Sequence, residues 1–319
     1  MADPVPHAHP ALSTSAGSLP RVHSLWSSRA KRGICFWLLF SVAACPSVRA
    51  QIKRPKIFGI SFVRISCTED CGRARFYEAF LPFAGDCMWC GRLFLFDIGR
   101  AEPQSSINDS QEITLTISSP IPDPAGLAEI AFATGDIDRF DRYLHERGVY
   151  TVPRKSDVGI AFDDPGGHHI CIVQDDPPTL TYAHKVLGMR LVHAGFIVRN
   201  RDSMEIFYKD ILGFHSYWHD GIKDSETNWM DMQVPDGTDW IDFMLNVRAN
   251  ADKQTLGIMN HIALGVPDVR AAAKVLESRG VKSPEKHQIG PDGTCIELME
   301  FTPLQPPCCN PYTGLFPKP

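Results

Sequence analysis

The sequences LVHAGFIV at Leu191–Val198 and MNHIALGV at Met259–Val266 each place one histidine inside an apolar run. Apolar runs of this length, rich in Val, Ile and Leu and without proline, predict buried or half-buried β-strands. Each run is followed by a segment with an Asp near its start and a Gly at its end, which predicts an amphipathic helix. The chain therefore contains two copies of one strand and helix pattern.

The same pattern occurs earlier in the chain, at Ile57–Ile65 and at Leu127–Ala133, and a helix is predicted from Asp136 to Gly148. Three of the four copies also end in a turn that contains Asp and Gly, followed by a strand. These turns begin at Asp164, Pro235 and Pro291. Four copies of one unit, a strand, a helix and further strands, are thus predicted between residues 56 and 303.

This unit, closed by its Asp-Gly turn and final strand, resembles the vicinal oxygen chelate superfamily. That superfamily includes glyoxalase I, extradiol ring-cleaving dioxygenases, and the bleomycin and fosfomycin resistance proteins. The resemblance implies an α+β fold of tandem βαβββ modules, in which four units form two half-open barrels. It implies an N-terminal domain over residues 56–178, a C-terminal domain over residues 186–304, and a Pro/Cys-rich tail over residues 305–319.

In that superfamily, metal ligands lie on the first and last strands of each unit. The matching positions in the C-terminal half are His193, Asp242, His261 and Glu297. Two imidazoles and a carboxylate suit a divalent metal and leave positions open for two adjacent substrate oxygens. Asp242 is the weaker member, because its short side chain could instead orient a ligand imidazole. Glu300 is three positions beyond Glu297 on the same strand, so it should point to the opposite face.

The N-terminal half lacks this set. Its matching positions are Phe62, a stretch near Leu95 without a clear acid, Glu129 and Cys171. Because Phe62 cannot bind a metal, we expect a structural or substrate-lining barrel there. The fourth unit is shorter than the third between its first-strand histidine and its last-strand acid, which predicts that it lacks one strand.

Other candidates for chemistry are weaker. His215, Tyr217 and His219 follow the third helix and could act as an acid or base, although an amphipathic edge strand explains them equally. His168 and His169 follow a Gly-Gly turn and are expected to be exposed. The sequence has no phosphate-binding glycine loop, serine nucleophile elbow or dinucleotide fingerprint.

Charge divides the chain at its N-terminus. Residues 1–50 hold five basic side chains and one acid, and removing these from totals of 32 and 37 leaves 27 and 36, a formal charge of -9. The basic cluster, the short apolar run Ile34–Phe40 and the small residues up to Ala50 predict a signal peptide and export to the periplasm or outside the cell. A lipoprotein box ending at Cys45, with a lipid anchor, is an alternative, as is an uncleaved anchor or a mistaken start codon. The mildly acidic composition excludes a basic nucleic-acid surface.

The ten cysteines are interpreted in the light of export, since an oxidising compartment favours disulfides. A zinc site is a less favoured alternative, formed by Cys67, Cys71, Cys87 and Cys90. The pair at 308–309 lies in a Pro-rich tail and is expected to be loosely attached.

Three functions follow from the resemblance, all on a small molecule. Extradiol ring cleavage, which is slightly preferred, would use Fe(II) and three ligands. Glyoxalase-like lyase or isomerase chemistry would add Asp242 as a fourth ligand to Zn, Ni or Mn. A non-catalytic protein that sequesters a small molecule is the third. Whether the barrels pair within one chain or in a homodimer is left open.

Overall fold

In the computed structural model, Ala50–Pro319 forms one compact unit. The structure describes residues 51–67, 76–77, 79–80, 93–98, 111–117, 126–155, 158–175, 190–223, 225–281, 287–290, 293–301 and 310–317. The predicted signal peptide and the anchor at Cys45 lie outside these ranges. Within them, no helix is both long enough and apolar enough to cross a bilayer.

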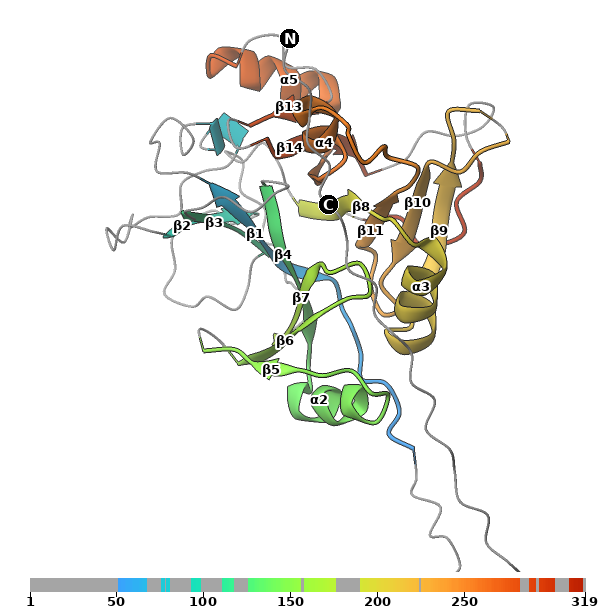
Figure 1. Cartoon of the computed structure of the whole chain (residues 1–319). Coiled ribbons are helices and arrows are strands. Elements are labelled where there is room, and N and C mark those ends of the chain that lie inside the picture. The colour runs from blue at the N-terminus through green and yellow to red at the C-terminus, as the bar shows by residue number, and fades with distance from the viewer. Residues whose placement is uncertain are drawn as a thin grey trace, which may run out of the picture. The chain divides into compact units, whose positions relative to one another are not determined.

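The C-terminal sheet has seven strands in the order β13-β14-β12-β8-β11-β10-β9 (Figure 1). Its strands are β8 (Arg190–Ile197), β9 (His215–Asp220), β10 (Trp229–Gln233), β11 (Trp240–Met244), β12 (His261–Val266), β13 (His287–Ile289) and β14 (Cys295–Glu300). The two histidine-bearing strands, β8 and β12, are antiparallel neighbours at its centre. Each is also parallel to the last strand of its own unit, β11 or β14. The first and last strands of both units therefore lie side by side.

The N-terminal sheet repeats this arrangement with the strand order β2-β3-β1-β4-β7-β6-β5 (Figure 1). Its strands are β1 (Ile60–Cys67), β2 (Leu93–Ile98), β3 (Gln111–Ile117), β4 (Gly126–Thr134), β5 (Val152–Pro153), β6 (Gly159–Asp163) and β7 (His169–Gln174). In the described residues, the third unit has four strands and the fourth has three, as the shortened sequence predicts. The α+β fold of repeated units is confirmed, as two open sheets.

The bounds of the helices are α2 (Ile137–His145), α3 (Arg201–Ile206), α4 (Lys253–Ile258) and α5 (Val269–Ser278). Three of the helices lie close to the predicted positions, whereas α4 is not predicted from the sequence. Asp136 and Asp268 cap α2 and α5 by accepting a backbone N–H in the first turn. The Asp near the start of the third predicted helix, Asp202, is expected to cap it. This prediction is wrong, because the Asn200 side chain caps α3 and Asp202 lies in its first turn. The helix then continues as a π-helix, η2 (Phe207–Ile211), to Gly213, whose positive φ ends it.

Strand alternation gives each sheet an apolar and a polar face. In β12 and β14, Ile262, Leu264, Ile296 and Leu298 pack in the main core with Leu276 of α5. The alternate residues of these strands face the other way. Two of them, His261 and Glu297, are also buried. A buried polar face of this kind requires partners for its polar groups.

Two of the cysteines can be compared with the disulfide expectation. Cys171 on β7 and Cys295 on β14 are buried thiols in different sheets, so the expectation is wrong for them. Cys71, Cys87 and Cys90 of the alternative zinc site lie outside the described residues, as do the pair at 308–309. Residues 310–317 are described, and they pack against the C-terminal sheet rather than lying apart from it.

Candidate metal centre

Three predicted ligands meet on the polar face of the C-terminal sheet. His193 on β8, His261 on β12 and Glu297 on β14 offer ligand atoms that lie within 4.8 Å of one another, and all three residues are buried. The Nε2 atoms of the two histidines are 2.9 Å apart. The Oε2 atom of Glu297 is 3.7 Å from each of them. The pairing of first and last strands thus brings together residues up to a hundred positions apart in the sequence.

These distances fit a shared metal ion. Ligand bonds of about 2.0–2.2 Å place two donors about 3.0 Å apart at a right angle and about 3.5 Å apart at a tetrahedral angle. The observed separations of 2.9 and 3.7 Å lie close to that range. Two imidazole nitrogens that face each other also need either a proton or a cation between them. The donor set, two nitrogens and one carboxylate oxygen, suits Fe(II), Mn(II), Zn(II) or Ni(II).

A glycine makes room for this arrangement. Gly195 lies directly opposite His261 in the β8–β12 ladder. A Cβ atom at position 195 would lie 2.1 Å from Cε1 and 2.5 Å from Nδ1 of the His261 ring. Any side chain there would therefore displace the imidazole. Only a residue without a Cβ allows this ring to lie over the strand beside it.

Asp242 lies beside the three ligands. Its Oδ2 atom is 3.9 Å from Nε2 of His261. It is opposite Asp231 of β10 in the ladder, and the two side chains are hydrogen-bonded. Burial, reinforced by the Asp242 and Glu297 carboxylates, raises the pKa of Asp231 well above its ordinary value. The burial of Asp231 and the carboxylates beside it thus favour its neutral form.

The three acid or base candidates of β9 reach different environments. Tyr217 is fully buried and its ring centroid is 5.1 Å from that of Trp240, which in turn is 4.9 Å from that of His193. His215 is exposed and its Nε2 atom is 3.1 Å from Oε1 of Gln233. His219 is exposed and pairs with Met230, which points away from the face that carries Asp231. The structure therefore brings only Tyr217 into the aromatic group beside the histidines.

Residues 310–317 cover the edge of this sheet. They hydrogen-bond to β9 and β10 at several points, listed here as donor to acceptor: Trp218 Nε1 to Asn310 O, Thr313 N to Tyr217 O, Gln233 Nε2 to Leu315 O, and Leu315 N to Gln233 Oε1. The strand β9 is the last in the sheet order, so its outer backbone groups need such partners.

A chain of aromatic rings links this segment to the candidate metal ligands. The Tyr312 ring stacks on Trp218 at an interplanar angle of 13° and lies 5.0 Å from Tyr217. Tilted ring contacts continue from Tyr217 through Trp240 to His193. The hydroxyl of Tyr217 is buried without a hydrogen-bond partner among the described residues. A bound molecule could engage this hydroxyl.

The other predicted residues are also placed. His168 is half-buried, with Nδ1 3.0 Å from a carboxylate oxygen of Asp164, so its expected exposure is wrong, whereas His169 is exposed. Glu300 is exposed on the opposite face from Glu297, and its Oε1 accepts a hydrogen bond from the N–H of Val269 at the start of α5. In the N-terminal sheet, Glu129 and Cys171 belong to a second polar group, described below, and Phe62 packs in an apolar cluster that includes Cys171.

Sequence reasoning missed Gly195, Asp231 and the segment 310–317. A signal existed for Asp231, which is a lone acid inside the apolar strand WMDMQ. Gly195 also follows His193 at the spacing that places both on one face. The segment 310–317 has no periodic pattern, so nothing in its sequence predicts where it binds.

The C-terminal sheet thus carries a buried His-His-Glu group on one face, a donor set that suits a divalent metal ion. Residues 175–300, which include the entire C-terminal sheet, match the family model of the Glyoxalase/Bleomycin resistance protein/Dioxygenase superfamily. The chain therefore contains a domain of that superfamily, as the sequence resemblance predicts.

Solved structures share the fold over a longer range. Homoprotocatechuate 2,3-dioxygenase from Arthrobacter globiformis is 14% identical, with a TM-score of 0.60 over 78% of this chain and 81% of that chain. The 2,3-dioxygenase LapB from Pseudomonas sp. KL28 is 15% identical, with a TM-score of 0.54 over 84% of this chain and 96% of that chain. At such identities the likeness is one of fold. No curated protein sequence matches the chain significantly.

Proposed function

We propose that this protein is a metal-dependent enzyme that cleaves a catechol-like ring in the extradiol manner, with His193, His261 and Glu297 holding Fe(II). The observation that carries the proposal is the convergence of two imidazole nitrogens and one carboxylate oxygen, all buried, at 2.9 and 3.7 Å. Fe(II) bound there would chelate two adjacent substrate oxygens and activate dioxygen. The fold shared with two 2,3-dioxygenases supports this choice of reaction.

The position of Asp242 supports three protein ligands over four. Its carboxylate is hydrogen-bonded to Asp231, and it is not one of the three residues whose ligand atoms all lie within 4.8 Å of one another. In this role Asp242 fixes the surroundings of His261 rather than completing the coordination. Glyoxalase-like chemistry, which would use Asp242 as a fourth ligand, is therefore the second choice.

Tyr217 would orient the substrate. Burial, with Tyr312 and Asp231 nearby, raises the pKa of Tyr217, so its hydroxyl stays protonated at neutral pH and acts as a donor. Its ring and that of Trp240 form a buried aromatic group beside His193, and edge-on or tilted contacts of this kind suit a further aromatic ring.

Anaerobic loading of the full chain with Fe(II), followed by addition of catechols and oxygen, tests the proposal. We expect oxygen consumption and a ring-opened product that contains both atoms of labelled dioxygen. His193→Ala and Glu297→Gln should each abolish this activity and lower the bound iron at least tenfold. Glu300→Gln is the matched control, since it changes an exposed acid on the same strand and keeps the acceptor for Val269.

Two other results would replace the proposal. Bound zinc, nickel or manganese that requires Asp242, without oxygen consumption, would favour the glyoxalase-like reaction. Absence of stoichiometric metal in the wild type, unchanged in His193→Ala/His261→Ala, would favour sequestration of a small molecule.

We also propose that the protein is exported, because residues 1–50 combine a basic cluster with a short apolar run. Mass spectrometry of the mature protein separates the alternatives. A start near Gln51 supports cleavage, a lipid on Cys45 supports an anchor, and an intact N-terminus overturns both.

A further inference from the structure

The N-terminal sheet carries a counterpart of the metal centre. Cys171 of β7 pairs with Ala131 of β4, as Asp242 of β11 pairs with Gly195 of β8. Glu129 is two residues before Ala131, as His193 is two residues before Gly195. By strand and register, Glu129 and Cys171 thus match His193 and Asp242.

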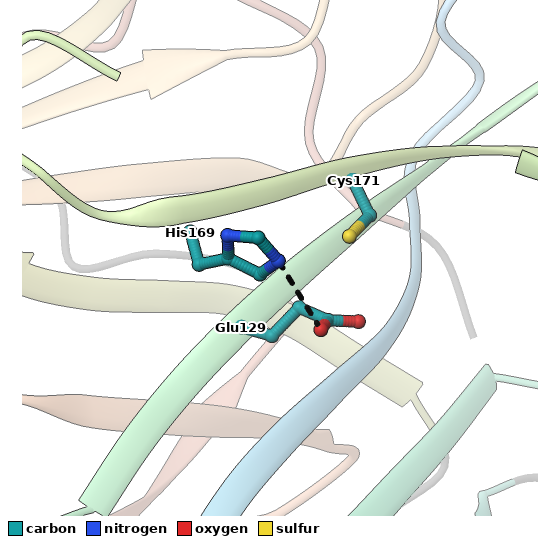
Figure 2. A group of neighbouring side chains, drawn as sticks. All are labelled: Glu129, His169 and Cys171. Carbon is teal, nitrogen blue, oxygen red and sulfur yellow. Dashed lines mark ion pairs between the residues drawn. The ribbon is translucent and has the colours of Figure 1, made fainter. Parts of the chain in front are cut away.

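The side chains of this counterpart also converge. Glu129, His169 and Cys171 offer metal-binding atoms within 4.8 Å of one another, and Figure 2 shows the three side chains approaching the same point. The Nε2 atom of His169 is 3.9 Å from Oε2 of Glu129. Glu129 and Cys171 are buried, whereas His169 is exposed at the rim.

Guanidinium groups already fill this cluster. Nη1 of Arg154 donates to Oε1 of Glu129 at 2.5 Å and lies 2.6 Å from Sγ of Cys171. Nη1 of Arg64 donates to Oε2 of Glu129 at 2.9 Å. Both carboxylate oxygens therefore accept from an arginine. The Arg154 side chain is only 6% exposed, and its guanidinium carbon lies 5.2 Å from the centre of the Phe62 ring.

We propose that Arg154 is a built-in cation that occupies the N-terminal counterpart of the metal centre and keeps divalent metal ions out of it. Arginine does not lose its charge in a protein, so the two guanidinium groups outweigh the single carboxylate. A divalent ion placed among them would be repelled. Burial and the Glu129 carboxylate raise the pKa of Cys171 to about 12, and Arg154 opposes this shift.

The proposal predicts a latent site for a thiol-preferring metal such as Co(II), Zn(II) or Cd(II). Replacing Arg154 with a neutral residue would leave Glu129, His169 and Cys171 around a vacated position. One nitrogen, one oxygen and one sulfur donor suit these ions. The proposed iron site in the C-terminal sheet is a separate site, so the two ideas can fail independently.

Cobalt titration of the full chain tests it, because a thiolate bound to Co(II) gives a charge-transfer band in the near ultraviolet. We expect no Cys171-dependent band in the wild type or in Arg154→Lys, which keeps the charge. We expect Arg154→Gln and Arg154→Ala to bind one additional Co(II) per chain and to show the band. Cys171→Ser in the Arg154→Gln background should remove the band, which excludes Cys295 as its source.

Several results would overturn the proposal. A band in the wild type that Cys171→Ser abolishes would mean that metal enters despite Arg154. Absence of additional cobalt in a folded Arg154→Gln or Arg154→Ala variant would mean that the cluster is no latent site. Repeating the titration in a His193→Ala/His261→Ala background separates this outcome from the C-terminal site, since the additional ion should persist there. If either variant fails to fold, the wild-type titration still tests the proposal, because a band there that depends on Cys171 contradicts it.

Discussion

At the scale of single residues, the geometry of the candidate metal centre depends on a residue without a side chain. A Cβ atom on Gly195 would lie far inside the contact distance of the His261 ring. We expect Gly195→Ala to turn this imidazole away from His193 and to lower metal affinity at least tenfold. Overpacking should also lower the free energy of unfolding by about 1–3 kcal/mol. Competitive metal titration and urea unfolding measure the two effects.

Gly135→Ala is the control for this substitution. An added Cβ at Gly135 would make only ordinary contacts, 3.5 Å from the Phe58 ring. We expect it to leave metal affinity unchanged. If Gly195→Ala binds metal as tightly as Gly135→Ala does, the proposed role of Gly195 is wrong.

Asp231 gives a prediction about pH. Its pKa is raised in the folded state, chiefly by burial and then by Asp242. In the unfolded chain its pKa is about 3.9. Its contribution to stability is therefore complete below that ordinary value and is lost as the pH rises towards the folded-state pKa. Asp231→Asn cannot ionise and keeps a donor for Asp242. We expect the metal-free variant to be more stable than the wild type by about 1 kcal/mol at pH 7, with no gain at pH 4.

Urea unfolding at both pH values measures this difference. Asp210→Asn, which changes an exposed acid of η2, should show no such pH dependence. An Asp231→Asn variant that is less stable at pH 7 than the wild type would mean that the ionised carboxylate is needed in the fold.

The sequence identifies the three candidate ligands, which the structure brings together, but not the residues around them. His193 and His261 stand out because each is a polar residue in an apolar strand, and Glu297 follows a recognisable turn. The role of Gly195 depends on the His261 ring reaching across from another strand, which only the register specifies. Arg154 comes from outside the repeated positions, so no comparison of the units could place its guanidinium against Glu129.

At the scale of elements, the segment 310–317 acts as part of the C-terminal sheet. It satisfies backbone groups of β9 and lays Tyr312 over Trp218. We expect a chain that ends at residue 309 to lose about 2–4 kcal/mol of stability, from the lost hydrogen bonds and apolar burial. Thermal unfolding measures the loss, and tryptophan emission should shift to the red as Trp218 becomes exposed.

Removing only residues 318–319 is the matched control, because it leaves the docked segment complete. Equal stability of the two truncated chains would contradict the role of the segment. The substitution Tyr312→Ala should give part of the loss, about 1–2 kcal/mol, if the aromatic stack contributes as the geometry suggests.

The elements themselves follow local rules to different degrees. Capping by Asp136 and Asp268 is a local interaction and is predicted correctly. The change from α3 to the π-helix η2 is not predicted from the sequence. It accompanies tertiary contacts such as the hydrogen bond from the Tyr208 hydroxyl to Asp164 in the other half of the chain. Local sequence cannot encode a partner more than forty residues away.

At the scale of the molecule, buried polar contacts join the two sheets. The N–H of Ile60 in β1 donates to Oδ2 of Asp239 at 2.8 Å, and Arg190 of β8 pairs with the same carboxylate. Burial raises the pKa of Asp239, with Arg190 opposing the shift. Breaking such a buried ion pair costs about 3–5 kcal/mol. The repeat pattern predicts two similar halves, but contacts between the halves lie outside the pattern and could not be predicted from it.

We therefore expect the two sheets to unfold together. Cys171 and Cys295 are buried thiols, one in each sheet, so thiol labelling along a urea series with mass spectrometry follows each sheet separately. Both should become reactive at one midpoint. Asp239→Asn should lower both midpoints equally, because it removes the charge that pairs with Arg190. The corresponding loss in the free energy of unfolding should be about 3 kcal/mol. Two separate midpoints, or a shift of Cys295 alone, would mean that residues 56–178 and 186–304 unfold as independent domains.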